Sequence, residues 1–538
     1  MNSRLSHTIG PTERPLLEMT IGDNFDRIVS RFPDREAVVD VPTGQRWTYT
    51  TLRADVNAVA SALLEDGIAP GDRIGIWAPN CAEWVIVQHA AAKVGAILVN
   101  LNPAYRSHEL EYVVTQSGIR LMFAAPSFKT SDYEAMVAEV SPRCPGLDQV
   151  IIFGSDEWAS LLIRGDQASS ERLTEVQASL SPDDPINIQY TSGTTGFPKG
   201  VTLSHRNILN NGFFVGELLG YTEQDRICVP VPFYHCFGMV MGNLGASTHG
   251  ACVVIPSPSF DPVATLTACA QERCTSIYGV PTMFISMLNV PDFDSYDLSS
   301  VRTGAMAGSP CPVEIMKQVT AWVPEVAIAY GMTETSPAST QTWVDDSLDR
   351  RVSTVGRAHP HVEVKVVDPA TGETVPRGTS GELCIRGYSV MLGYWNEPGK
   401  TAEALDAGGW IHSGDLAVMD ADGFVAITGR IKDMVIRGGE NIYPREIEEF
   451  LYTHPDILDA QVIGVPDAKY GEELMVWLRL RAGVEPIDVA GLREFCEGRL
   501  ARYKIPRYVH CVDQFPMTVS GKVRKVEMRE RALQILGL

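Results

Sequence analysis

The stretch Tyr190-Thr-Ser-Gly-Thr-Thr-Gly-Phe-Pro-Lys-Gly200 combines hydroxyl groups, glycines and one lysine in a single segment. The apolar run from Ile186 to Tyr190 predicts a strand before this segment, and the run from Val201 to Leu203 predicts a second strand after it. Glycines in a tight turn allow backbone N–H groups to face an anion. The segment is therefore predicted to be a loop that holds nucleotide phosphates, and ATP is the first ligand to consider.

This loop is not that of a P-loop NTPase. The pattern G-x-x-x-x-G-K-[ST] requires Gly where Pro198 stands and Ser or Thr where Gly200 stands. A surface loop rich in Ser, Thr and Gly with a solvated lysine is the alternative interpretation. Such a loop would explain a short match, whereas this one extends from Tyr190 to Gly200.

The loop closely resembles the signature of the adenylate-forming superfamily, which includes acyl-CoA synthetases, the adenylation domains of peptide synthetases and firefly-type luciferases. Further segments resemble the other motifs of that superfamily and occur in the same order: the nucleotide and magnesium motif Tyr330-Gly-Met-Thr-Glu-Thr335, the ribose motif Ser413-Gly-Asp-Leu416, the hinge motif Gly429-Arg-Ile-Lys-Asp433 and the lysine motif Pro516-Met-Thr-Val-Ser-Gly-Lys522. The resemblance covers nearly the whole chain. Within the superfamily the sequence is most similar to medium-chain fatty acyl-CoA ligases.

The composition agrees with a large folded enzyme. The chain has 538 residues, more than one hydrophobic core usually organises, so several domains are expected. The net charge of −21 argues against broad affinity for nucleic acids or anionic membranes. The segment Met1 to Thr20 has no apolar signal-peptide core, and no apolar run is long enough to span a membrane. The 11 cysteines lack C-x-x-C spacing, which predicts a reduced, cytoplasmic protein.

Helix and strand patterns alternate in the N-terminal part, which predicts an α/β architecture with mixed or parallel sheets. A helix with a threonine cap is expected to open within Trp47 to Arg53 and to run to Leu64. A buried strand is expected over Asp72 to Ala78, an amphipathic helix over Ala82 to Ala92 and a strand over Ala96 to Val99. Short alternating strands between Val362 and Leu392 predict a small antiparallel β unit.

The resemblance implies two domains. Residues 1–430 are expected to form the AMP-binding and acyl-binding part, with two α/β sheet subdomains and a small β-barrel-like unit. Residues 431–538 are expected to form a small, mobile α+β domain that contains one helix from Pro444 and strands near Gln461 to Val465 and Met475 to Leu480. Lys432, which lies at the junction, is expected to be the hinge.

The nucleotide contacts are also carried over from the resemblance. Asp415 can accept hydrogen bonds from both ribose hydroxyls, and Arg430 would add a charge-assisted contact to ribose or phosphate, with a structural ion pair as its alternative role. Tyr330 is expected to stack on adenine, with an ordinary core tyrosine as the alternative. The remaining expected contacts are the phosphate-loop residues Thr191, Ser192, Gly193, Thr194, Thr195 and Lys199, the adenine-flanking residues Gly308, Ser309 and Pro310, and Gly331.

Attack of a carboxylate on the α-phosphate builds negative charge on phosphoryl oxygens, so cations must converge there. The resemblance implies that Thr333 contacts the α-phosphate and that Glu334, with Thr333, holds Mg²⁺, an ion that prefers oxygen ligands. Lys522 is implied to reach the carboxylate and the α-phosphate during adenylation. Outside these motifs, a lone glutamate or lysine would more often be a solvated side chain.

The segment Val231-Pro-Phe-Tyr-His-Cys-Phe-Gly-Met239 indicates the substrate class. Amino-acid-activating relatives carry an aspartate here to pair the substrate ammonium, whereas this chain has Tyr234 and His235, so an amino acid substrate is disfavoured. His235 resembles the histidine that lines the acyl pocket of fatty acyl and aryl ligases, and a satisfied core histidine is the alternative. Nearby methionines and glycines predict a pocket for a flexible aliphatic chain.

The acceptor is predicted from Arg437-Gly-Gly-Glu-Asn-Ile-Tyr443, which resembles the loop that lines the pantetheine tunnel of coenzyme A ligases. Gly438 and Gly439 would let a thin chain approach, and a plain hairpin turn is the alternative. The prediction is an ATP- and Mg²⁺-dependent acyl-CoA synthetase for a medium to long chain. The alternatives are a fatty acyl-AMP ligase that loads a carrier protein, an aryl-CoA ligase, and a silent nucleotide- or lipid-binding protein. The oligomeric state is left open, with a homodimer among the options.

Overall fold

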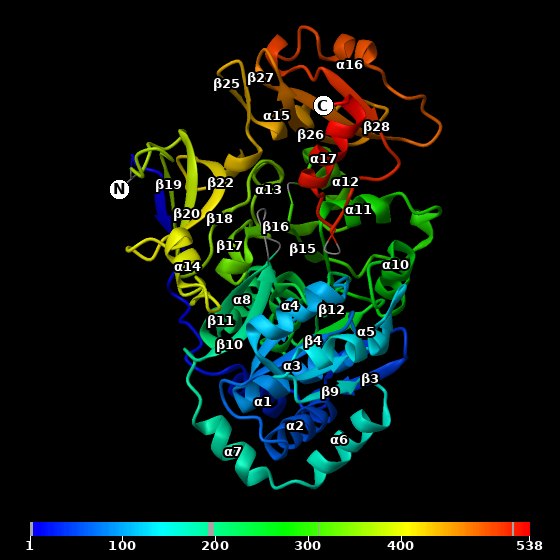
Figure 1. The fold of residues 1–538 in the computed structure, drawn as a ribbon, viewed down its shortest axis with the longest axis vertical. Helices are drawn as coiled ribbons and strands as arrows, with labels where there is room; N and C mark the ends of the chain where they lie inside the picture. Colours follow the sequence, from blue (N-terminus) through cyan, green and yellow to red (C-terminus); the bar gives the residue numbers. More distant parts are fainter. Residues whose placement is uncertain (1–3, 192–197, 310, 519–520) are drawn as a thin grey trace.

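Two large sheets form the body of the chain, of which the computed structural model describes residues 4–191, 198–309, 311–518 and 521–538 (Figure 1). The first sheet is parallel from β10 to β9, and β11 adds to β10 in the antiparallel direction. Across this sheet the strands are β21 (Gly393–Tyr394), β11 (Lys199–Ser204), β10 (Pro185–Thr191), β5 (Ile97–Asn100), β4 (Arg73–Trp77), β6 (Ile119–Ala124) and β9 (Gln149–Ile152).

The second sheet is parallel from β16 to β2 and has antiparallel strands at both edges. Across it the strands are β18 (Arg357–Ala358), β17 (Ala338–Gln341), β16 (Glu325–Gly331), β15 (Thr303–Ala307), β14 (Ser276–Gly279), β12 (Arg226–Cys228), β13 (Cys252–Ile255), β2 (Glu36–Asp40) and β3 (Gln45–Thr48). Parallel strands need long crossover connections, and helices supply most of them here. Each sheet therefore belongs to an α/β unit, as predicted.

Helices cover the faces of these sheets. Thr48 caps α2 by accepting the N–H of Thr51, so the predicted helix with a threonine cap is confirmed. The prediction of an amphipathic helix over Ala82 to Ala92 is wrong, because α3 is buried at every position except Glu83. The reason is that α3 packs on β4 and β5 of one sheet and on β2 of the other. The α-helices of this part are α1 (Ile21–Arg31), α2 (Tyr49–Glu65), α3 (Ala82–Val94), α4 (Ser107–Ser117), α5 (Tyr133–Val140), α6 (Asp156–Gln167), α7 (Ser170–Ala178), α8 (His205–Leu218), α9 (Gly245–Ser247), α10 (Pro262–Gln271), α11 (Pro281–Leu288), α12 (Val313–Thr320), α13 (Leu348–Ser353) and α14 (Pro398–Ala404).

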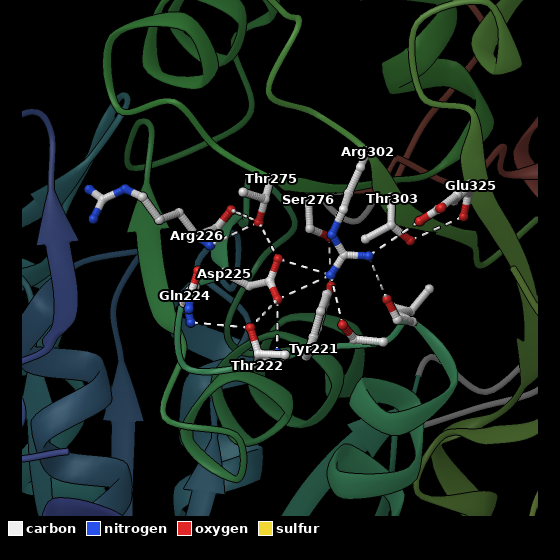
Figure 2. Close-up of polar contacts among 12 residues, drawn as sticks. Tyr221, Thr222, Gln224, Asp225, Arg226, Thr275, Ser276, Arg302, Thr303 and Glu325 are labelled. Carbon is white, nitrogen blue, oxygen red and sulfur yellow. Dashed lines mark hydrogen bonds and ion pairs between the residues drawn. The ribbon is translucent and has the colours of Figure 1, made fainter.

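A polar network ties together the starts of four neighbouring strands of the second sheet (Figure 2). Its centre is Asp225, which is 4% exposed and lies just before β12. Both carboxylate oxygens accept from Arg302 at 3.0 and 3.1 Å, and one accepts from the Thr275 hydroxyl at 2.6 Å. Arg302 also donates to Glu325 at the start of β16. One buried charge thus links β12, β14, β15 and β16.

The third sheet is the predicted antiparallel β unit. Its strands are β1 (His7–Ile9), β19 (Val362–Val367), β20 (Ser380–Gly387), β22 (Ile411–Met419) and β23 (Val425–Arg430). The register of β20 on β22 shifts between Glu382 and Cys384, so that β22 bulges over Ser413, Gly414 and Asp415. Bulges re-aim side chains beside functional sites. Asp415 lies on this bulge.

Residues after Arg430 build a separate α+β unit at one end of the molecule (Figure 1). Val435, Ile442, Val462 and Val476 belong to hydrophobic clusters that contain no buried residue from before Val435. The predicted helix from Pro444 is confirmed as α15, and the described residues contain two further α-helices, α16 and α17, that were not predicted. The elements are β24 (Val435–Arg437), β25 (Glu440–Ile442), α15 (Pro444–Leu451), β26 (Ile457–Asp467), β27 (Gly471–Leu480), α16 (Val489–Cys496), β28 (Tyr508–Cys511) and α17 (Lys525–Leu536). Among the described residues, no helix combines the length and apolar character needed to cross a bilayer.

Replacement of Arg302 by alanine is expected to destabilise the large domain by about 3 kcal/mol, because Asp225 would remain as a buried charge without its main partner. Urea unfolding of Arg302→Ala and wild type measures this difference. The matched control is Lys317→Ala, which breaks an exposed ion pair with Glu314 and should cost at most about 1 kcal/mol. Equal losses in the two variants would contradict the central role of Asp225.

Candidate active site

Tyr330, Asp415 and Arg430 form one hydrogen-bonded group. The Tyr330 hydroxyl donates to Asp415 Oδ2 at 2.7 Å, and Arg430 Nε donates to Oδ1 at 2.9 Å. The register of β22 on β23 sets Asp415 directly opposite Arg430. Burial and the nearby carboxylate raise the pKa of Tyr330, so its hydroxyl stays a donor. The carboxylate is held at both oxygens and keeps lone pairs for further donors such as a pair of ribose hydroxyls.

Thr333 and Glu334 lie in a 3-10 turn (Thr333–Thr335) just after β16. Both side chains are buried, and Glu334 Oε1 accepts from the Tyr394 hydroxyl at 2.9 Å. Lys199 lies with its Nζ 4.7 Å from the centre of the same tyrosine ring. Tyr394 therefore joins the end of the phosphate loop to the predicted metal motif.

His235 lies in the loop after β12. Its Nδ1 accepts the N–H of Phe237 at 3.2 Å, so a neutral ring carries its proton on Nε2. Burial and the Lys522 ammonium lower the pKa of His235 to about 3. Neighbouring Cys236 lies with its Sγ 3.9 Å from the Thr333 hydroxyl. The histidine is therefore a neutral polar group at the wall of the site.

Lys522 reaches this group from the C-terminal domain. Gly521 O, one residue earlier, accepts from the Thr282 hydroxyl at 3.1 Å, which docks the lysine loop on the start of α11. A side chain on Gly308 would begin 3.3 Å from Lys522 Cε, so Gly308 leaves room for the lysine. Burial is the main cause of a lowered pKa for Lys522, and the acids Asp415 and Glu334 oppose that shift. The structure thus brings Lys522, His235 and the Thr333–Glu334 turn together.

Some predicted residues lie apart from this group. Gly438 and Gly439 form the turn between β24 and β25, and Gly438 N donates to Tyr470 O at 2.8 Å. Figure 1 places β25 at the outer end of the C-terminal domain. Lys432 lies in the short turn Ile431–Asp433 between β23 and β24, where the hinge was predicted. The predictions for Ser192, Gly193, Thr194, Thr195 and Pro310 lie outside the described residues.

The other predicted contacts frame the same space. Thr191 and Lys199 pair across β10 and β11 at the two ends of the phosphate loop. Ser309 follows Gly308 after β15 and is half-buried. A side chain on Gly331 would begin 1.7 Å from Pro337 O, so the backbone there approaches too closely for any other residue.

Sequence reasoning missed Tyr394. It stands on the two-residue strand β21, which pairs with β11. A strand of that length carries no periodicity, so the pairing that brings Tyr394 to Glu334 has no local signal.

A cavity of about 430 Å³ lies beside the site, between the two domains. Asn80, Pro103 and Met283 line it from the large domain, and Arg479 and Gly521 line it from the small domain. Lys129 adds a second positive charge to its wall. The cavity ends at the loop that carries Lys522.

Known proteins match this chain over almost its full length. Bacillus subtilis (strain 168) YngI, provisionally named an acyl-CoA synthetase, is 47% identical over 97% of this chain and 99% of its own. The mitochondrial medium-chain acyl-CoA ligase ACSF2 of Danio rerio is 45% identical over 99% of this chain and 91% of its own. The solved structure of the anthranilate CoA ligase AuaEII in complex with anthranoyl-AMP is 25% identical, with a TM-score of 0.88 over 98% of this chain and 99% of that one.

The family models agree with these relatives. Residues 25–395 match the model described as AMP-binding enzyme. Residues 446–522 match the model described as AMP-binding enzyme C-terminal domain. The family predicted from the motifs is confirmed, and the chain belongs to the AMP-binding enzyme family.

Proposed function

We propose that this protein is an ATP-dependent, AMP-forming acyl-CoA synthetase. A carboxylic acid and ATP give acyl-AMP and pyrophosphate, and the thiol of coenzyme A then displaces AMP to give acyl-CoA. The observation that carries the proposal is the meeting of Lys522 from one domain with His235 and the Thr333–Glu334 motif from the other. The names of the relatives, acyl-CoA synthetase and medium-chain acyl-CoA ligase, support the same reaction.

The adenylation step needs a bound nucleotide and stabilised charge. Asp415 accepts the ribose hydroxyls, and Tyr330 and Arg430 keep its carboxylate oriented. Lys522 places an ammonium beside the attacking carboxylate and the α-phosphate, in a site that excludes much of the water. Neutral His235 borders the substrate carboxylate and adds no second positive charge to that of Lys522.

The residues present fit a magnesium ion. Glu334 and Thr333 offer hard oxygen donors in a buried turn, and Mg²⁺ is usually bound by one or two carboxylates together with substrate phosphates and waters. Tyr394 holds one Glu334 oxygen in place. When bound there, Mg²⁺ would neutralise charge on the phosphate oxygens of ATP.

Coenzyme A is the acceptor in this proposal. Lys129, on the large-domain wall of the cavity beside Gly521, suits a phosphorylated ligand. We further propose that residues 1–430 and 431–538 act as two domains joined at Lys432. The lysine loop faces the site in this structure, and rotation at Lys432 would present Gly438 and Gly439 in its place.

A fatty acid of medium to long chain is the proposed substrate. Tyr234 and His235 offer no carboxylate to pair the ammonium of an amino acid, and the relatives named medium-chain acyl-CoA ligase support an aliphatic chain. The π-helix Phe237–Leu244 behind these two residues is entirely buried and carries Met239 and Met241, which adapt to a flexible chain. All eleven cysteines lie in the described residues and are free, which supports the cytoplasmic location that we also propose.

Pyrophosphate release with octanoate, measured with and without coenzyme A, tests the function directly. We expect release in both cases and octanoyl-CoA only when the thiol is added. Release without any thioester would favour a fatty acyl-AMP ligase that loads a carrier protein. If neither octanoate nor an aryl acid such as anthranilate causes release of pyrophosphate, the result would contradict an active ligase for these two classes of acid.

Lys522→Ala is expected to slow acyl-AMP formation by about 10² to 10⁴-fold, which is the scale of losing a positioned electrostatic group. The variant should still convert supplied acyl-AMP to thioester. Lys432→Pro should show the reverse pattern, because a fixed φ restricts the rotation after adenylation. Each half-reaction is measured separately.

The control for the charge is Arg524→Ala, which removes a nearby exposed cation and should change neither step by more than about twofold. If Lys522→Ala and Lys432→Pro impair the same half-reaction equally, the two-position model of the small domain is wrong.

Tyr330→Phe is expected to weaken AMP binding by about tenfold, because a hydrogen bond to a charged group contributes about 1.5–3 kcal/mol and the variant leaves Asp415 less well oriented. Calorimetric titration with AMP measures the change. The matched control is Tyr452→Phe, which removes a similar bond to Asp459 in the C-terminal domain. Unchanged AMP affinity in a folded Tyr330→Phe protein would separate this group from the nucleotide.

A further inference from the structure

Three potential metal ligands of different types meet on the small antiparallel sheet. One ligand atom each from Glu382, Cys384 and His412 lies within 4.8 Å of the others. His412 Nδ1 is 2.8 Å from Glu382 Oε2 and 3.5 Å from Cys384 Sγ. Cys384 stands opposite His412 on the neighbouring strand, and Glu382 lies two residues before it on the same face of β20.

We propose that Glu382, Cys384 and His412 form a zinc site. Carboxylate, thiolate and imidazole are the ligands that Zn²⁺ takes, and three protein ligands with one open position are a common set. Zn–S and Zn–N bonds of about 2.3 and 2.05 Å in a tetrahedron separate sulfur and nitrogen by roughly 3.5 Å. The observed 3.5 Å between Sγ and Nδ1 agrees with that spacing. When zinc binds, the 2.8 Å distance between His412 Nδ1 and Glu382 Oε2 must increase by about 0.5 Å to reach the separation of two ligands in a tetrahedron.

The surroundings of the ligands fit a bound cation. His412 Nε2, on the far side of the ring, lies 3.8 Å from Asp406 Oδ2. A carboxylate at the second ring nitrogen is the usual partner of a metal-bound histidine, because it fixes the ring and its tautomer. The thiol proton leaves to solvent, so one thiolate and one carboxylate balance the two charges of Zn²⁺.

Zinc can reach this site from solvent. The His412 side chain is 36% exposed, and that of Glu382 is 12% exposed. A second cluster, Cys228, Cys269 and Cys274, also brings three sulfur atoms within 4.8 Å of one another. Cys384 and all three of those cysteines are 0% exposed. The sheet cluster differs in that its other two ligands reach the surface, so the fully buried cysteine cluster supplies a control.

The zinc site touches the bulge that carries Asp415. Glu382 Oε1 accepts the N–H of Gly414 at 3.0 Å, which leaves Oε2 for the metal. His412 stands at the other side of the bulge, on the same strand. A metal held by both residues would fix the two ends of the bulge. Zinc should therefore raise the thermal midpoint of the protein.

The test is a zinc titration of the full chain after removal of metals by a chelator, with a chromophoric chelator as competitor. We expect one equivalent of Zn²⁺ per chain. Co²⁺ in its place should give the intense visible bands of a tetrahedral ion and a sulfur-to-cobalt band in the near ultraviolet. Cys384→Ala should abolish the sulfur-to-cobalt band and weaken zinc binding at least 100-fold. Asp406→Asn should weaken zinc binding about tenfold.

His412→Gln replaces a partly exposed side chain and provides a second ligand variant if Cys384→Ala does not fold. The matched control is Cys269→Ala, which should leave zinc affinity and the cobalt spectrum unchanged. If Cys269→Ala loses zinc binding and His412→Gln retains it, the metal is bound by the buried cysteine cluster and the proposal is overturned. The absence of stoichiometric binding by the wild type would also overturn it.

Discussion

The contact between the lysine loop and the start of α11 brings Lys522 to the candidate active site. Gly521 has a φ of 79°, and a side chain there would begin 2.8 Å from Val280 Cγ2. Only glycine combines that backbone conformation with so close an approach. The Thr282 hydroxyl then holds Gly521 O, and Lys522 enters the space next to Gly308 and His235. Without this docking, Lys522 would not enter the buried space that contains Asp415 and Glu334.

The electrostatics of the site follow from that docking. Lys522 brings a positive charge into a buried space that already contains Glu334 and Asp415. His235 stays neutral beside it, so the lysine meets no second cation on that side. The Asp415 carboxylate is committed to Tyr330 and Arg430, which keeps it oriented toward a ligand and away from an ion pair with the lysine. The ammonium of Lys522 and the carboxylate of Asp415 are therefore not paired with each other and are both available to a ligand.

Local sequence patterns correctly predicted the helices and strands that have a clear hydrophobic period or a capping residue. The helix after Thr48 and the strands around the phosphate loop follow from such signals. The prediction that α3 is amphipathic was wrong because both large sheets cover this helix. The sequence of the helix alone does not show that a polar residue such as Gln88 is buried. Helix α17 was missed because it buries only Met528 and Ala532. So sparse a pattern does not stand out from a polar loop.

The sequence by itself determined the family and the order of the motifs, because each motif is a short run whose residue types and spacing are set by local backbone geometry. The tertiary structure alone decided which of these residues meet. Tyr394 joins Glu334 through a two-residue strand, Lys522 arrives from another domain, and Glu382, Cys384 and His412 converge across two strands. These contacts depend on strand register and domain docking, which arise from long-range packing and leave no signal in the spacing of neighbouring residues.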